Sequence, residues 1–363
     1  MYEAWRAPFP TTWRRAAPFR GVFPPLTREY TAKILFAPAA GARGILLAVS
    51  GGPDSVALML LAGQWRKTSA TPPIAIATVD HGLRNEAAAE ARSVGEWARA
   101  LGFTHHVLTF DGAKPKSRIQ ERARALRYDL LAACAQKIGA DMLVTAHHAD
   151  DQAETILFRL TRGSGVAGLA GMARLSAQRG LTLFRPLLDI PKAGLVALCE
   201  RAGHAYFRDP SNADTTFARP RLRQLGATLA DLGLSREALL RLSARAAGAD
   251  DALRRKALEA AAKLDWRVEK TKRRADLLPL ADEPGEIVLR VLAGALGGGD
   301  EVLRLERLET LACGLLAALR ARKPFASTLA GWVVRLTKTG MLTLSREPQR
   351  RRGARLRDAA NSP

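Results

Sequence analysis

Cysteine is scarce in this sequence. Only three cysteines occur in 363 residues, at Cys134, Cys199 and Cys313, and no two of them form a CxxC pair. This spacing argues against a disulfide framework, a zinc ribbon and an iron–sulfur site. Cys134 and Cys199 fall in apolar stretches of helical pattern, which predicts buried, unreactive thiols in a reducing compartment.

Long apolar runs are also absent. Apolar residues make up 47% of the chain, but no uninterrupted segment reaches the roughly 18 residues that a membrane helix requires. The sequence therefore predicts a soluble, cytoplasmic protein that does not enter a membrane. The length of the chain suits about two domains.

Acidic residues are too few to balance the basic ones. Lysine and arginine total 56 against 35 aspartates and glutamates, which gives a formal net charge of +21. A positive field of this size steers polyanions such as nucleic acids toward the protein. Composition alone does not separate RNA, DNA and anionic lipid, and a plain solvated basic surface in an arginine-rich proteome is the alternative.

Both ends of the chain are basic. Residues 1–36 contain no apolar segment of the kind found in secretory signals, and their arginine-rich, acid-poor composition resembles that of a transit peptide. We expect residues 1–40 to be a poorly ordered extension outside the fold, or the result of a start codon placed too early. The arginine-rich tail at 348–363 is expected to be disordered.

Between these ends, short apolar runs alternate with stretches of helical periodicity. The apolar runs are nearly continuous, which is typical of parallel strands that helices bury on both faces. We therefore predict an α/β fold with a Rossmann-like parallel sheet, in which ligands bind beyond the carboxyl ends of the strands. The predicted strands and helices, in chain order, are 45–49, a helix from Pro53, 74–79, 85–101, 106–110, 117–138, 142–146 and 149–160.

The pattern changes in the second half of the chain. Residues 216–265 are rich in alanine, leucine and arginine, with helical spacing and no strand signal. We predict an α/β catalytic domain at 41–215, a basic helical domain at 216–325 and a terminal β-hairpin at 326–347.

The first predicted strand leads into a glycine-rich turn, Ser50-Gly51-Gly52-Pro53-Asp54-Ser55. The glycines let the backbone turn tightly and direct several N–H groups onto one anion. Pro53 suits the first position of a helix, which places Asp54 and Ser55 beside the positive end of the helix dipole. The turn lacks the lysine of the GxxxxGK[ST] loop, and an ordinary strand-to-helix turn is the alternative. We predict a pyrophosphate cradle in which Asp54 acts through Mg²⁺, because a bare carboxylate would repel phosphates.

The hexapeptide Ser-Gly-Gly-x-Asp-Ser resembles the PP-loop of the N-type ATP pyrophosphatases. This resemblance implies that ATP is split between its α and β phosphates, that a substrate oxygen is adenylated, and that a nucleophile displaces AMP. It also implies ATP and Mg²⁺ as cofactors, held by the loop from Ser50 to Ser55.

Further segments are similar to the tRNA(Ile)-lysidine synthases within this class, and the similarity is dense over residues 43–225. In the family pattern His81 binds the nucleotide, and Arg127 meets its α-phosphate, where charge builds during adenylation. A loop histidine and a solvated arginine are the alternatives. The segments that carry the resemblance are Asp80-His81-Gly82-Leu83-Arg84, Ala123-Arg124-Ala125-Leu126-Arg127-Tyr128, the run from Ala146 to Thr155, and the glycine-rich stretch 163–172.

Carboxylates and a histidine follow the fourth predicted strand. Asp151 and Glu154 share one face of a helix, and His147 one turn earlier points the same way. The resemblance implies that these three residues hold the ε-amine of lysine and activate it. Helix capping by Asp150 or Asp151 is the alternative. A zinc site fits less well, because no second histidine has ligand spacing.

A last family element reads Arg-Asn-x-x-Arg, whereas this chain has Arg219-Pro220-Arg221-Leu222-Arg223. Arg219 occupies the position expected to face substrate or tRNA, and it is counted among the candidate catalytic residues. Pro220 in place of asparagine could shift the start of the following helix, which weakens the assignment of Arg219.

The resemblance implies a two-step reaction on tRNA(Ile) with a CAU anticodon. The C2 oxygen of the wobble cytidine attacks the α-phosphate of ATP, and the lysine ε-amine then displaces AMP to give lysidine. The basic helical part and tail would hold the tRNA backbone, and a homodimer is one option for the assembly. The alternatives are a tRNA thiolase, which usually carries paired cysteines, an amide synthetase such as NAD synthetase, and a non-catalytic RNA-binding relative.

Overall fold

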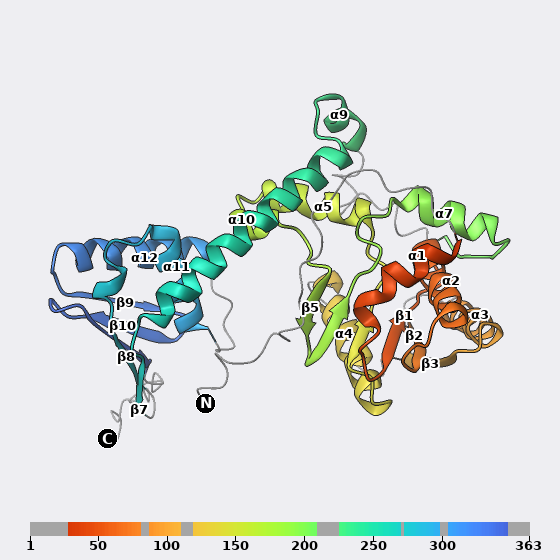
Figure 1. Cartoon of the computed structure of the whole chain (residues 1–363), viewed down its shortest axis with the longest axis horizontal. Helices are drawn as coiled ribbons and strands as arrows, with labels where there is room; N and C mark the ends of the chain where they lie inside the picture. Colours follow the sequence, from red (N-terminus) through yellow and green to blue (C-terminus); the bar gives the residue numbers. More distant parts are fainter. Residues whose placement is uncertain are drawn as a thin grey trace, which may run out of the picture. The chain divides into compact units, whose positions relative to one another are not determined.

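The chain consists of two compact units, residues 1–247 and residues 248–363. Figure 1 colours the first from red to green and the second from teal to blue. The structure is a computed structural model, and it describes residues 28–80, 87–109, 119–208, 225–269, 272–297 and 304–347.

A six-stranded sheet forms the centre of the first unit, in the order β3-β2-β1-β4-β6-β5. All neighbouring strands are parallel except β5, which is antiparallel to β6 at the edge. The predicted parallel α/β sheet is therefore confirmed. The strands are β1 (Ile45–Ala48), β2 (Ile74–Asp80), β3 (Thr104–Thr109), β4 (Met142–Val144), β5 (Leu175–Gln178) and β6 (Leu181–Phe184).

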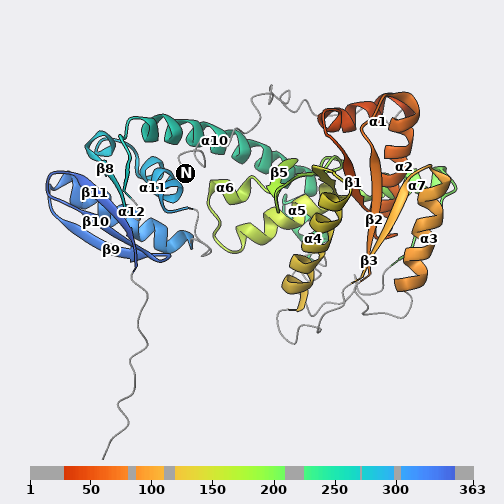
Figure 2. The same ribbon diagram turned by 90° about the horizontal axis from the view of Figure 1, so that it is seen from below.

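Helices cover both faces of this sheet because alternate residues of β1 point to opposite sides. Ile45 and Leu47 pack with residues of α2, α3 and α7, whereas Leu46 packs with residues of α4. Figure 2 shows α4 on one side of β1 and β2, and α2 and α3 on the other. The helices are α2 (Pro53–Thr68), α3 (Ala87–Ala100), α4 (Ile119–Lys137), α5 (Ala149–Leu160), α6 (Val166–Leu169), α7 (Lys192–Arg201) and α9 (Gly226–Asp231).

A helix that precedes the sheet corrects the expectation that residues 28–39 lie outside the fold. Helix α1 (Arg28–Phe36) leads into a 3-10 turn, η1 (Ala37–Ala39). Phe36 is fully buried, with its ring stacked on Trp65 of α2 at 5.0 Å between centroids and edge-on to Phe184 at 6.4 Å. The sequence prediction relied on the basic composition of this stretch and therefore did not assign Phe36 to the core. The rest of the predicted extension, residues 1–27, lies outside the described residues.

We expect Phe36→Ala to lower the free energy of unfolding by about 3–5 kcal/mol, because a large buried ring is replaced by a cavity. The matched control is Ile34→Ala in the same helix, since Ile34 is 52% exposed and its loss should change stability by no more than about 0.5 kcal/mol. Urea unfolding of both variants measures the difference. Equal effects would show that α1 does not contribute to the core.

The first unit also extends past the predicted end of the catalytic domain at residue 215. Leu239, near the start of α10 (Arg236–Ala262), is buried against Ala153 and Ile156 of α5, and Leu229 of α9 packs beside it. The start of α10 therefore shares a core with the helix that carries the predicted acidic residues.

The second unit contains a five-stranded antiparallel sheet in the order β7-β8-β11-β10-β9. The predicted hairpin is present as β10 and β11, but β8 pairs with β11, so the hairpin is part of a larger sheet. The elements are β7 (Arg267–Glu269), β8 (Lys272–Asp276), η3 (Leu278–Leu280), α11 (Gly285–Leu296), α12 (Leu305–Arg320), β9 (Phe325–Leu329), β10 (Trp332–Leu336) and β11 (Met341–Arg346).

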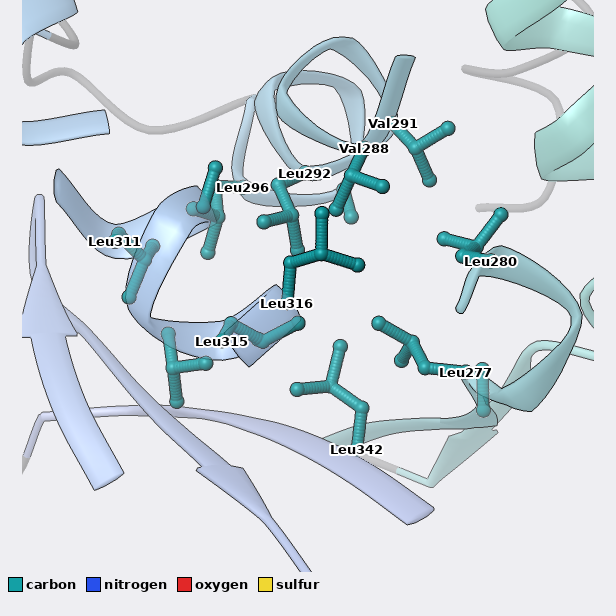
Figure 3. Close-up of a cluster of buried hydrophobic side chains, with 14 of the residues drawn as sticks. Leu277, Leu280, Val288, Val291, Leu292, Leu296, Leu311, Leu315, Leu316 and Leu342 are labelled. Atoms are coloured by element: carbon teal, nitrogen blue, oxygen red, sulfur yellow. The ribbon is translucent and has the colours of Figure 1, made fainter. Parts of the chain in front are cut away.

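One apolar core joins the helices and strands of this second unit (Figure 3). Leu292 of α11 and Leu315 of α12 lie in the same buried cluster as Leu342 of β11. This differs from the predicted division into a helical domain at 216–325 and a hairpin at 326–347, because the helices bury the face of the sheet. Across the described parts of both units, no helix is long and apolar enough to cross a membrane.

Candidate active site

The glycine-rich turn joins β1 to α2, as predicted. Gly52 is the N-cap of α2 and Pro53 is its first residue, and no side chain caps the first turn. The N–H groups at this helix start are therefore available to an anion. Ser55 fixes the turn from inside, because its Oγ donates to the carbonyl of Gly52 at 2.9 Å and accepts the N–H of Ser50 at 3.1 Å.

Gly51 is required by the space and the conformation at its position. Its φ is +86°, and a Cβ added there would lie 2.7 Å from the ring of Phe207. Phe207 also donates its N–H to the carbonyl of Gly51 at 2.9 Å, and its ring stacks on Trp97 of α3 at 5.2 Å. Phe207, in the segment that follows α7, thus packs against the glycine-rich turn.

Helix α5 starts with a capping box that the sequence did not predict in this form. His148 is the N-cap, and its Nδ1 accepts the N–H of Asp151 at 3.3 Å. Asp151 Oδ2 in turn accepts the N–H of His148 at 3.1 Å. The alternative of capping by Asp151 is therefore correct in part, and His148 is its partner. Sequence reasoning missed His148 because histidine is not a usual N-cap, although the spacing of three residues to Asp151 was a signal.

His148 joins the glycine-rich turn to the acidic helix. Its Nε2 lies 3.5 Å from Asp54 Oδ2 and 3.5 Å from Asp151 Oδ2, and its Nδ1 lies 3.6 Å from Asp150 Oδ2. Burial opposes charge on the ring, but the hydrogen bond to Asp54 and the charges of Asp151, Asp54 and Asp150 outweigh it, so the pKa of His148 is raised. The turn and the start of α5 therefore form one site.

The two neighbouring aspartates of α5 have different surroundings. Burial raises the pKa of Asp151, and the charges of Glu154 and Asp54 add to this effect against the opposing charge of His148. Burial acts against the ionised form of Asp150 as well, but the N–H of Lys192 and the charge of Arg236 lower its pKa overall. A carboxylate with a raised pKa is the better proton acceptor near neutral pH, which favours Asp151 for that role.

Asp150 connects three helices instead of capping α5. Its Oδ2 accepts the N–H of Lys192, the first residue of α7, at 2.7 Å. Its Oδ1 lies 3.3 Å from Nη1 of Arg236, the first residue of α10. Asp150 therefore fixes the starts of α7 and α10 relative to α5.

The remaining candidate residues lie just before α5, on α5, on α4 or outside the described residues. His147 is half-buried and its Nδ1 lies 2.8 Å from the hydroxyl of Thr145. Glu154 is half-buried on α5, and Arg127 lies on an exposed part of α4. The predicted nucleotide contact His81 and the family arginine Arg219, with Pro220 beside it, lie outside the described residues.

One oxygen of Asp54 suits a magnesium ion. Asp54 Oδ1 is buried and has no hydrogen-bond partner among the residues that the structure describes, whereas Oδ2 contacts His148. No group of three histidine, cysteine, aspartate or glutamate side chains could hold a metal within the described ranges. A Mg²⁺ ion at Asp54 would therefore need phosphate oxygens and water as its other ligands, which is the usual arrangement beside a nucleotide.

The glycine-rich stretch 163–172 is pinned to α5. The side chain of Gln152 accepts the N–H of Met172 at 2.7 Å and donates to its carbonyl at 2.9 Å. Arg159 donates to the carbonyls of Gly168 and Gly171 at 2.8 and 2.7 Å. These hydrogen bonds hold residues 168–172 against α5.

The buried thiol of Cys199 on α7 contacts the carbonyl of Pro53 at 3.4 Å. Burial, with the charges of Asp54 and Glu200, raises its pKa to about 11. Cys134 is also buried, and burial raises its pKa. Both thiols therefore stay protonated near neutral pH, as expected for structural cysteines.

Comparison with known proteins agrees with this geometry. A family model described as a PP-loop domain matches residues 26–228, so the strand-to-helix turn and its parallel sheet place the chain in the PP-loop class. A tRNA(Ile)-lysidine synthase of Rhodopseudomonas palustris is 47% identical over 335 residues, which cover 88% of this chain and 96% of that protein. The synthase of Methylobacterium nodulans is 46% identical, with coverage of 91% and 98%. The chain belongs to the tRNA(Ile)-lysidine synthase family.

A solved structure shares the fold. It is the U34-tRNA thiolase NcsA from Methanococcus maripaludis with its 4Fe-4S cluster, and the TM-score is 0.52. The similarity covers 60% of this chain and 77% of that one, at 16% sequence identity. At this identity the likeness shows the fold alone.

Proposed function

We propose that this protein joins lysine to C2 of the wobble cytidine in the CAU anticodon of tRNA(Ile), using ATP and giving lysidine, AMP and pyrophosphate. Family membership over nearly the whole chain supports this function. The observation that carries the mechanism is the contact of Asp54 with His148, which unites the phosphate-binding turn with the acidic start of α5. A reaction with two steps at one cytidine needs both parts within reach of the same atom.

In the first step the turn from Ser50 to Ser55 would bind the phosphates of ATP through its N–H groups and the dipole of α2. The C2 oxygen of the cytidine attacks the α-phosphate, and pyrophosphate leaves. We assign Arg127 to the α-phosphate, where a guanidinium stabilises the developing charge. His81 is assigned to the nucleotide, and Arg219 to the substrate or tRNA. When bound, Mg²⁺ would offset the phosphate charge, and Asp54 would hold it through Oδ1.

In the second step the ε-amine of lysine attacks C2 and expels AMP. His147, Asp151 and Glu154 would hold the ammonium form of this amine and accept its proton, because a protonated amine has no lone pair for attack. The raised pKa of Asp151 suits it to accept this proton.

Recognition of tRNA would rest on the basic charge of the chain. The formal net charge of +21 suits a partner with a phosphate backbone, and affinity for it should fall as salt rises. A wobble base in a single-stranded loop can be unstacked at low cost, which gives access to C2. For the assembly, a homodimer stays a prediction that sedimentation can measure.

A tRNA thiolase was the first alternative to a lysidine synthase that the sequence analysis left open. Cys134 and Cys199 are both buried, and the third cysteine, Cys313, lies on α12 of the second unit. None of the three forms a pair with CxxC spacing, so the chain offers no cysteine cluster for sulfur transfer or an iron–sulfur centre. These positions favour ligation of lysine.

The test uses radiolabelled lysine, ATP and two tRNA transcripts that share a CAU anticodon, tRNA(Ile) and tRNA(Met). We expect label in the isoleucine species only, together with AMP and pyrophosphate. Absence of lysine transfer, with pyrophosphate still released, would refute the choice of lysine as the nucleophile. Equal labelling of both transcripts would refute the specificity for tRNA(Ile).

A further inference from the structure

A lysine from α7 reaches the carboxylate of the phosphate-binding turn. The turn itself, residues 50–55, contains neither lysine nor arginine. Lys192 Nζ lies 3.8 Å from Asp54 Oδ2, and its side chain is 45% exposed. Other phosphate-binding turns use a lysine of their own as a point charge for the phosphates. In this protein the cation comes from another helix.

The backbone of Lys192 is held by hydrogen bonding, whereas its side chain is half exposed. Its N–H is held by Asp150 Oδ2 at 2.7 Å, and Asp150 is held in turn by Arg236. The same helix is packed against the turn, because the thiol of Cys199 contacts the carbonyl of Pro53 at 3.4 Å. The start of α7 therefore keeps a constant distance from the turn, and the half-exposed side chain can move between ligands.

The contact between Lys192 and Asp54 is a weak one. A separation of 3.8 Å is longer than a charge-assisted hydrogen bond of about 2.8 Å, and ion pairs exposed to water contribute little. Asp54 Oδ2 also lies 3.5 Å from His148 Nε2. This oxygen therefore keeps a partner when the ammonium group of Lys192 moves away. Phosphate oxygens in the turn carry more charge than one carboxylate and would draw the ammonium group away.

We propose that Lys192 is a further nucleotide-binding residue, whose ammonium group binds the pyrophosphate portion of ATP in the turn. The bond between the α-phosphorus and the bridging oxygen breaks during adenylation, and the electron pair goes to the departing pyrophosphate. An ammonium group placed there stabilises this charge more in the transition state than in bound ATP. The role in adenylation rests on the proposed function, but the binding of pyrophosphate does not.

The experiment measures the affinity of the full chain for inorganic pyrophosphate and for ATP, each with Mg²⁺ and without tRNA, by calorimetry. Lys192→Ala should weaken both affinities about tenfold or more, because a charge-assisted hydrogen bond is lost. Lys192→Arg should restore most of the affinity. The matched control is Lys67→Ala in the last turn of α2, which removes the same charge about 20 Å along the helix from the turn.

A purely structural role for Lys192 gives a different pattern. In that case Lys192→Ala would change the melting temperature and leave the affinity for pyrophosphate within twofold of the parent, and the proposal would be wrong. Loss of pyrophosphate affinity in a variant that melts at the parent temperature supports it. If Lys192→Ala loses affinity for pyrophosphate but the parent protein transfers no lysine to tRNA(Ile), the proposed function fails and the assignment of Lys192 remains. If the parent protein transfers lysine and Lys192→Ala keeps the parent affinity for pyrophosphate, only the assignment of Lys192 is wrong.

Discussion

Asp54→Ala should abolish tRNA-dependent ATP–pyrophosphate exchange, with a loss of at least about a hundredfold. The variant loses the buried Oδ1, for which the described part of the chain offers no hydrogen-bond partner, and this is the oxygen that would hold Mg²⁺ against the phosphates. Binding of tRNA should persist, because this carboxylate is not part of a basic surface. Exchange is measured with labelled pyrophosphate, and tRNA binding with a filter assay.

Asp54→Asn sharpens this test. The amide has nearly the shape of the carboxylate and can keep a contact with His148, but it lacks the charge that a hard cation requires. We expect a loss close to that of the alanine variant. The control is Asp129→Asn on α4, where the carboxylate is about half exposed and pairs with Arg179. Unchanged exchange in Asp54→Ala would discard the role of Asp54 with the metal.

Asp151→Asn should separate the two steps of the reaction. The amide oxygen can still accept the N–H of His148, as Asp151 Oδ2 does at 3.1 Å, so the start of α5 should remain intact. The variant cannot accept a proton from the lysine amine, and loss of a general base reduces the rate by about a hundredfold or more. We therefore expect lysine transfer to fall by that factor while pyrophosphate exchange continues.

Glu154→Gln provides an independent check of the same step, because Glu154 is not part of the capping box. It should also reduce lysine transfer more than exchange. Melting temperatures of both variants show whether α5 is still folded, and Asp129→Asn again serves as the charge control. If exchange and transfer fell together in Asp151→Asn, Asp151 would act through His148 and Asp54 rather than on the amine.

The conformation of the glycine-rich turn could be predicted from sequence because its signals are local. Two glycines, a proline and an aspartate after an apolar strand specify the backbone at residues 50–55 within a few positions. The approach of Asp54 to α5 could also be expected, since parallel strands end at one edge of the sheet. Pairing of β1 with β4 confirms it.

Features that depend on distant partners were not predictable in the same way. His148 is important because it is buried among carboxylates from two elements, and only the tertiary structure shows this. Lys192 is far from Asp54 in sequence, and nothing in its local pattern indicates the contact. Strands β7 and β8 are mostly charged and exposed, so they lack the alternation that marks a strand. Charged side chains of this kind are common on an edge strand such as β7.

A structure of the protein with lysine and α,β-methylene-ATP, which resists cleavage between the α and β phosphates, tests the shared site most directly. The proposed mechanism predicts the triphosphate within hydrogen-bond reach of the free N–H groups in the turn at residues 51–55, with the lysine ε-amine beside Asp151 and Glu154. A nucleotide bound elsewhere on the sheet, or a lysine remote from α5, would contradict a single centre for both steps.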